Sequence, residues 1–353
     1  MNSVKQNIAG LNGLRGLAAY IVAISHFAGA TKTGDGFLQA GKMGVMIFFA
    51  LSGFLMAHLY LTDKPTSIRE IVNYVIRRFT RVYPLFLLFV LLSVMAVEFG
   101  SNRLSKVMFQ IDQSILIDHI LLQKGVSVLW TIPVEFKFYF AFVFIMASWS
   151  KFKEFSLLLI LAVLFYNAMA GYPGAVNPTG AQFWSGYSSY FLIGILSALF
   201  SKKFNSETVN MATLNLGFVM CLALLPLLVP RAYGLIFPTD EGWVRNEVYI
   251  FYSGLIVFFC AHASFAKTVF GNRLIAFLGL ISFSVYLVHV PVLRFIRIYT
   301  DIDQNVALYA LAYFFVVTVV SALLYFLFEK PTMTWLNTKL IRSRDPVKHA
   351  VVS

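Results

Sequence analysis

Long apolar runs recur along the whole chain, and they constrain its fold more than any other feature. Ten segments are apolar enough and long enough to cross about 30 Å of hydrocarbon as α-helices. They cover residues 12–31, 41–62, 82–100, 130–149, 155–171, 183–201, 211–229, 247–266, 274–296 and 305–328. We therefore expect an all-α polytopic membrane protein in which residues 1–353 form a single integral-membrane domain, ending in a short cytoplasmic tail at 329–353.

Charge is scarce in this chain and unevenly placed. Only 12% of the residues are charged, against about 25% in soluble domains, and the net charge is +12. The loops on one predicted side hold 18 of the 28 Lys and Arg residues, and those on the other side hold 9. Because cytoplasmic loops are enriched in Lys and Arg, we expect both termini in the cytoplasm. This topology and anionic lipid headgroups explain the basic residues, so no nucleic-acid partner is expected.

Residues 63–81 differ from the apolar runs on either side. Ser67 and Glu70 form the pattern of a capping box, and apolar residues then recur at helical spacing along one face. Arginines occupy the rest of this segment, and Pro84 follows it. The pattern predicts an amphipathic helix that lies on the cytoplasmic surface of the membrane.

The arginines of this segment fall into two groups. Arg69 is assigned to lipid headgroups. Arg77, Arg78 and Arg81 are adjacent or three to four positions apart, so they are able to converge on one polyphosphate. Arginine suits phosphate because its planar fork donates two parallel hydrogen bonds.

The first apolar run carries an arginine near one end and a histidine within it. Arg15 and His26 are 11 positions apart, which is almost three helical turns, so they share one face with a rise of about 16 Å between them. Ionisable groups inside a membrane span are costly and point to function. The alternative is an orientation anchor at Arg15 and a packing histidine at His26. We favour function for the pair.

Two further ionisable side chains are expected at a similar depth. Glu135 and His289 lie in other spans, each a few residues from the outer end. Glu135 paired with His26 would fix the tautomer of the imidazole and raise its basicity. The alternative is that Glu135 pairs with Lys137 or contacts substrate, and His289 is as readily structural as functional. Ser52 is a candidate nucleophile, but a serine in such a helix more often bonds a backbone carbonyl.

The remaining candidates carry less chemistry. The two cysteines, Cys221 and Cys260, have no metal-ligand spacing, so no metal site is expected. His119 falls in a predicted loop and is interpreted as a solvated side chain.

Six stretches together resemble the membrane-bound acyltransferase-3 family of bacterial O-acyltransferases. They occur in the order expected for that family: LNGLRGLAAYIVAISHF, GKMGVMIFFALSGFLM, RRFTRVYP, LWTIPVEFKFYF, ISFSVYLVH and FEKP. The resemblance runs nearly from end to end. It departs from the family pattern at Asn12, where aspartate is usual, and at Met46, where a polar or acidic residue is common.

The resemblance implies a bacterial inner-membrane enzyme that transfers an acyl group, usually acetyl, from cytoplasmic acetyl-CoA to a glycan hydroxyl on the far side. It implies that Arg77, Arg78 and Arg81 hold the CoA phosphates with Arg15 at the entrance. It also implies that the pantetheine arm follows the first span to His26. His26 would then act as general base or carry the acyl group, and Glu135 would orient it or bind the sugar.

Two other functions remain open from the sequence. A secondary transporter for a sugar or a lipid-linked glycan fits ten spans with buried ionisable groups, although no inverted repeat is evident and the arginine cluster is then left without a ligand. A structural partner subunit with a degenerate site is the third interpretation, and the intact pair of Arg15 and His26 argues against it.

Overall fold

The structure is a computed structural model, and it describes residues 2–31, 40–62, 66–169, 182–204, 209–229 and 247–341. Every regular element in these ranges is helical, so the predicted all-α class is confirmed for the described residues. The first half of the chain forms α1 (Asn2–Ala30), α2 (Gly41–Tyr60), α3 (Ile68–Glu98), α4 (Asn102–Val107), α5 (Gln113–Ile120), the 3₁₀-helix η2 (Ser127–Trp130), α6 (Thr131–Trp149), α7 (Lys153–Met169) and α8 (Gln182–Lys203).

The second half contains shorter helices and sharper bends. It forms α9 (Met211–Leu224), the 3₁₀-helix η3 (Pro226–Leu228), α11 (Glu247–His262), α12 (Ser264–Phe270), α13 (Arg273–Leu280), α14 (Ser282–Tyr299), α15 (Val306–Leu324), the π-helical turn η5 (Tyr325–Glu329) and α16 (Lys330–Leu340). The chain bends by 88° between α11 and α12 and by 69° between α13 and α14.

The described residues contain fewer candidate membrane spans than the ten predicted. Six helical stretches of the described chain are long and apolar enough to cross a membrane, or up to eight if each bent pair is one span. The expected count of ten is therefore not confirmed. The predicted span 155–171 corresponds to α7, which has 17 residues, and positions 170 and 171 lie outside the described residues. The predicted span 183–201 corresponds to α8, which has 22 residues and is not among the six stretches.

The amphipathic segment is not a separate surface helix. The capping box at Ser67 is confirmed, but the helix that it starts continues through Pro84 to Glu98 as the single element α3. Its apolar face points outward: the Ile68 side chain is 76% exposed, whereas Arg78 is 8% exposed. The apolar face thus points away from the protein, as an interfacial helix requires. Arg77 and Arg78 are buried within the bundle, however, so a helix that lies free on the membrane surface is not confirmed.

The predicted tail also begins inside the bundle. The π-helical turn η5 joins α15 to α16, and residues Val306–Leu340 form one helical stretch. Glu329, at the start of the predicted tail, is buried. Further along, Asn337 accepts a hydrogen bond from Thr80 of α3 at 2.9 Å. Residues 342–353 of the predicted tail and residues 63–65 of the predicted surface helix lie outside the described residues.

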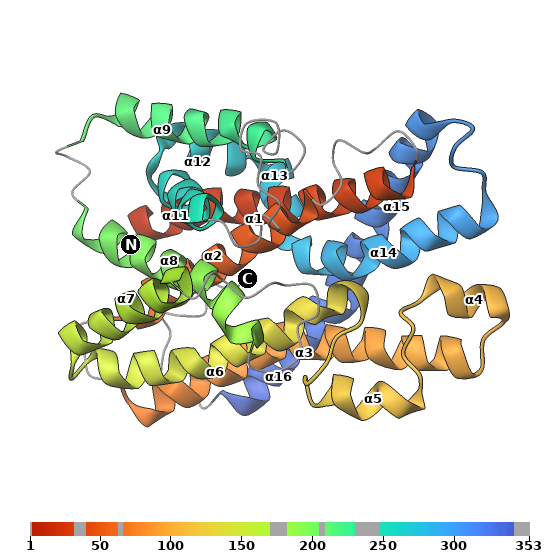
Figure 1. Cartoon of the computed structure of the whole chain (residues 1–353), viewed down its shortest axis with the longest axis horizontal. Coiled ribbons are helices and arrows are strands. Elements are labelled where there is room, and N and C mark those ends of the chain that lie inside the picture. Colours follow the sequence, from red (N-terminus) through yellow and green to blue (C-terminus); the bar gives the residue numbers. More distant parts are fainter. Residues whose placement is uncertain are drawn as a thin grey trace.

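Helix α1 is the centre of the bundle. It packs against α2, α11, α12, α13 and α14, and Figure 1 shows it crossing the middle of the molecule with α9 and α12 on one side and α3, α6 and α16 on the other. Two of these contacts bring backbones together. A Cβ atom at Gly279 of α13 would lie 1.8 Å from the carbonyl oxygen of Asn12, and one at Gly44 of α2 would lie 2.4 Å from that of Ala18. Close contacts at small residues therefore fix α1, which carries Arg15 and His26, against its neighbours.

The close contact between α1 and α13 predicts a strong effect of one methyl group. Gly279→Ala places an atom against rigid backbone, so we expect a loss of about 1–3 kcal/mol in stability, measured as a lower melting temperature of the purified protein in detergent. Gly217→Ala is the matched control, because its nearest neighbour is the ring of Phe259, which is able to turn aside. Equal melting temperatures for the two variants would contradict the packing described here.

Candidate active site

Two cavities open beside α1, and its two predicted site residues, Arg15 and His26, line different ones. We name them the arginine cavity, which contains Arg15, and the histidine cavity, which contains His26. The spacing of 11 residues predicted that Arg15 and His26 share one face of the helix, and each lines a cavity. It did not reveal that other helices divide the space between them.

The arginine cavity is small, with about 70 Å³ of space for water-sized molecules. Its polar lining includes three guanidinium groups and one carboxylate, from Arg15 on α1, Arg78 and Arg81 on α3, and Glu135 on α6. Three positive charges against one negative charge make this a cavity for an anion.

Glu135 is held by two hydroxyl groups. Its Oε1 accepts a hydrogen bond from Ser52 Oγ at 3.0 Å and another from the Tyr139 hydroxyl. The carboxylate also interacts electrostatically with Arg15 and Arg78. This geometry makes Ser52 a hydrogen-bond donor to the carboxylate, and it keeps the single negative charge of the cavity among the arginines.

Arg78 is the most buried of the three cavity arginines, and aromatic rings surround it. Its guanidinium carbon is 5.8 Å from the ring centres of both Tyr74 and Tyr139, a distance at which the rings attract a cation. Its Nε is buried and has no hydrogen-bond partner among the described residues. A buried N–H without an acceptor, in a cavity that is rich in positive charge, is what an anionic ligand would satisfy.

A second acidic residue lies behind this cavity and was not predicted as a site residue. Glu329 is buried, accepts a hydrogen bond from Ser284 Oγ at 2.6 Å, and interacts electrostatically with Arg81 and Arg15. It ends the π-helical turn η5, and such turns often occur at functional sites. In the sequence, Glu329 is the glutamate of the FEKP stretch, which indicates the family but assigns no role to this residue.

Arg77 does not join the other two arginines of the predicted cluster. It is buried, but it lines neither cavity. Adjacent residues on a helix point about 100° apart, so Arg77 and Arg78 face different neighbours. Only Arg78 and Arg81 of the three are in position to converge on one ligand with Arg15.

The histidine cavity is larger, with about 540 Å³ of space for water-sized molecules. His26 lines it and is exposed to it, and neither ring nitrogen has a hydrogen-bond partner among the described residues. Three cations line the same cavity: Lys42 of α2, and Arg294 and Arg297 of α14. An accessible imidazole with free ring nitrogens is able to accept a proton from a hydroxyl group that enters the cavity.

The neighbour of His26 is a second histidine, and the predicted pair with Glu135 is not formed. The ring centres of His26 and His289 are 5.0 Å apart. His289 is fully buried, its Nδ1 lies 3.2 Å from the carbonyl oxygen of Val285, and its Nε2 has no hydrogen-bond partner among the described residues. With the proton on Nδ1, the lone pair of His289 Nε2 is available to an N–H of His26 after a small rotation of either ring.

Two side chains are common to the lining of both cavities. Val45 of α2 and Tyr286 of α14 line both, and we call this pair the shared wall. The Tyr286 hydroxyl donates to the carbonyl oxygen of Val128 at 2.7 Å and accepts from Thr131 Oγ1 at 3.0 Å. These bonds tie the wall to η2 and to the start of α6.

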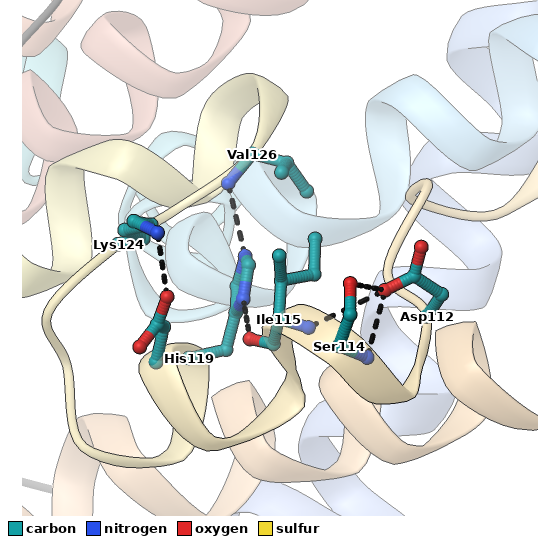
Figure 2. Close-up of polar contacts among 7 residues, drawn as sticks. Asp112, Ser114, Ile115, His119, Lys124 and Val126 are labelled. Carbon is teal, nitrogen blue, oxygen red and sulfur yellow. Dashed lines mark hydrogen bonds and ion pairs between the residues drawn. The ribbon is translucent and has the colours of Figure 1, made fainter.

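The segment before η2 is fixed by a buried histidine, as Figure 2 shows. His119 Nδ1 lies 2.8 Å from the Ile115 carbonyl oxygen, and His119 Nε2 accepts from the Val126 N–H at 3.2 Å. Lys124 and Asp118 form an ion pair at 2.6 Å across the same loop. The interpretation of His119 as a solvated side chain was wrong: it is fully buried, and it orders the chain that leads to the wall of the histidine cavity.

Comparison with known proteins covers nearly all of the chain. Residues 8–326 match the profile of the acyltransferase domain family. The peptidoglycan O-acetyltransferase OatA of Listeria monocytogenes is 23% identical over 337 residues, which cover 85% of this chain and 51% of that protein. A putative O-acetyltransferase of Staphylococcus aureus strain COL is 23% identical over 340 residues, or 86% of this chain and 53% of that protein. The chain thus spans about half the length of these relatives. No solved structure matches it.

The charge balance of the arginine cavity predicts the effect of removing its carboxylate. Glu135→Gln keeps a hydrogen-bond acceptor but leaves Glu329, behind the cavity, as the one countercharge described near three guanidinium groups. We expect a loss of about 1.5–3 kcal/mol in stability, seen as a lower melting temperature that sulfate partly restores. Glu154→Gln, at an exposed position on α7, is the control. A sulfate response no larger than that of the control would argue against an anion cavity.

Proposed function

This chain belongs to the acyltransferase-3 family, and on that premise we propose that it is a membrane O-acetyltransferase. It takes an acetyl group from acetyl-CoA on the cytoplasmic side and transfers it to a hydroxyl group of a glycan on the other side, such as lipopolysaccharide O-antigen or exopolysaccharide. One observation carries the proposal: an anion cavity and a cavity with an accessible histidine share a wall of only two side chains.

The arginine cavity is the proposed donor site. CoA carries a diphosphate and a further phosphate, and the guanidinium groups of Arg15, Arg78 and Arg81 offer paired N–H donors to such groups. The unpartnered Nε of Arg78 supports the fit. Glu135 does not bind phosphate in this account. It holds Arg15 and Arg78 in place through charge and keeps their mutual repulsion small.

The shared wall is the proposed meeting point of the two substrates. The pantetheine arm extends from the arginines along α1 toward His26, about 16 Å further along the helix axis. Val45 and Tyr286 lie on that path. Displacement of the Tyr286 ring, which breaks its hydrogen bond to Val128, would bring the thioester carbonyl into contact with the histidine cavity.

His26 is the proposed general base. Its free ring nitrogen accepts the proton of the acceptor hydroxyl as the oxygen attacks the thioester carbonyl. The carbon–sulfur bond then breaks, and the CoA thiolate leaves and takes up the proton from His26. A rival sequence has the His26 nitrogen attack the thioester first and pass the acetyl group on. In both sequences His289, and not Glu135, is the neighbour that orients the imidazole.

The proposed setting is the bacterial inner membrane with both termini in the cytoplasm. The excess of Lys and Arg in alternate loops supports this orientation. It gives the arginine cavity access to cytoplasmic acetyl-CoA, because Arg15 lies at the inner end of the first span.

A transporter of a sugar or a lipid-linked glycan is the second candidate, and the two bent helix pairs are the observation that favours it. Transporters often build their substrate sites from broken helices. The two functions differ in covalent chemistry, so the appearance of radiolabelled acetyl groups on a glycan acceptor distinguishes them.

The role of His26 predicts a large loss of transfer with no loss of donor binding. His26→Ala removes the base, and we expect the rate of acetyl transfer to fall by about 10²–10⁴-fold while acetyl-CoA still raises the melting temperature. His262→Gln is the control, because His262 bonds Ser201 away from both cavities. Transfer by the His26→Ala variant at the wild-type rate would remove His26 from the mechanism.

The two cavities predict that donor and acceptor dependence separate. Arg78→Gln removes a charged donor to phosphate, so we expect the KM for acetyl-CoA to rise by about ten- to a hundredfold with little change in the KM for the acceptor. Arg69→Gln, on the exposed start of the same helix, is the control, and Arg77→Gln should resemble it. A rise confined to the acceptor KM would reverse the assignment of the cavities.

A further inference from the structure

The histidine cavity carries an excess of positive charge that the transfer reaction itself does not require. Lys42, Arg294 and Arg297 line it, and no acidic side chain does so among the described residues. Acetyl transfer to a neutral sugar needs only the base and the thioester. The two arginines, Arg294 and Arg297, therefore point to a charged feature of the acceptor.

The two arginines are set one helical turn apart on α14, so both reach the same side of the cavity. The Arg294 guanidinium donates to the Met108 carbonyl oxygen at 2.5 Å, and its carbon lies 6.0 Å from the Phe109 ring centre. These contacts hold Arg294 in position and leave most of its five N–H donors for a ligand. Arg297 is exposed and forms no hydrogen bond or ion pair with the described residues.

Aromatic side chains line the same cavity. Trp130 and Tyr187 have ring centres 4.9 Å apart, and both contribute to the lining. Flat aromatic faces pack against the C–H faces of sugar rings, and tryptophan and tyrosine combine such a face with a polar edge. Aromatic rings together with cations suit a sugar that carries an anionic group better than a simple ion.

Resting on the proposed function, we infer that the acceptor is an anionic glycan, with a carboxylate or phosphate held by Arg294, Arg297 and Lys42 beside the hydroxyl that is acetylated. His26 lies in the same cavity and within electrostatic range of Arg294. The charged group and the reacting hydroxyl therefore belong to the same sugar or to neighbouring sugars. The cations select the acceptor and orient its hydroxyl toward the imidazole.

Binding of matched glycosides to the full-length protein in detergent tests this inference without requiring transfer. The probes are methyl β-D-glucuronide, its neutral twin methyl β-D-glucoside, and glucose 1-phosphate, each titrated by thermal shift. We expect at least one anionic probe to bind about tenfold more tightly than the neutral glucoside, with added salt reducing the difference. The stronger of the two anionic probes identifies carboxylate or phosphate as the group recognised.

Variants connect the preference to the cavity. Arg297→Gln should bring the charged and neutral probes to similar affinity, Arg297→Lys should restore part of the preference, and Arg273→Gln, exposed at the start of α13, should change nothing. Adenosine 3′,5′-bisphosphate, a fragment of CoA, should bind the Arg297→Gln variant as it binds wild type, because its site is the arginine cavity.

Several results would overturn the inference. The first is equal binding of the charged and neutral glycosides, or no binding of any of them. The second is a preference for the charged probes that survives Arg297→Gln. The third is stabilisation that only phosphatidylglycerol gives and that Arg297→Gln removes, which would assign the cations to a lipid. Acetyl transfer without charge preference would leave the proposed function standing and this inference refuted. Charge-selective binding without any acetyl transfer would support this inference and refute the proposed function.

Discussion

A charged side chain inside an apolar bundle needs a partner of opposite charge or a hydrogen-bond partner. The rest of the structure depends on how this chain supplies such partners. Arg15, Arg78 and Arg81 meet one carboxylate in the arginine cavity, and a second carboxylate, Glu329, lies just behind it. Ser52 and Tyr139 hold Glu135 where these charges converge. The cluster draws α1, α3, α6 and η5 together, and it keeps a net positive charge that the bundle itself does not neutralise. In our account the phosphates of the donor complete that balance.

The sequence was a good guide to helices and a poor guide to their orientation. Apolar runs predicted the helical class, because a backbone in lipid has few ways to satisfy its own hydrogen bonds. The segment that begins at Ser67 shows the limit. Its pattern identified a polar and an apolar face, but periodicity does not say which face meets the protein. The predicted membrane-surface helix would expose all of its arginines, whereas here Arg78 is buried within the bundle and Ile68 is exposed. The bends before α12 and α14 had no signal in the apolar pattern either.

The candidate site was predicted in its parts and only partly in its arrangement. Helical spacing placed Arg15 and His26 on one face because that relation is local to one helix. Depth along a span suggested that Glu135 and His26 would meet, but depth is one coordinate, and lateral position depends on how helices pack. The shared wall joins Val45 and Tyr286, which are far apart in the chain, so no local pattern predicted it. His289 lies beside His26, in the position that was predicted for Glu135. Nothing in the sequence distinguishes these two possible partners of His26.

Disulfide trapping of the donor thiol at the shared wall tests the central claim most directly. In a protein with Cys221 and Cys260, both buried and free, replaced by alanine, Val45→Cys is exposed to CoA activated as its pyridyl disulfide, and the adduct is measured by mass spectrometry. The account predicts a CoA adduct at position 45 that unmodified CoA competes away and that Arg78→Gln reduces. Leu92→Cys, on the exposed face of α3, is the control for non-specific reaction. Equal labelling at both positions, or labelling at 45 that is indifferent to Arg78, would show that the donor does not approach the wall through the arginine cavity.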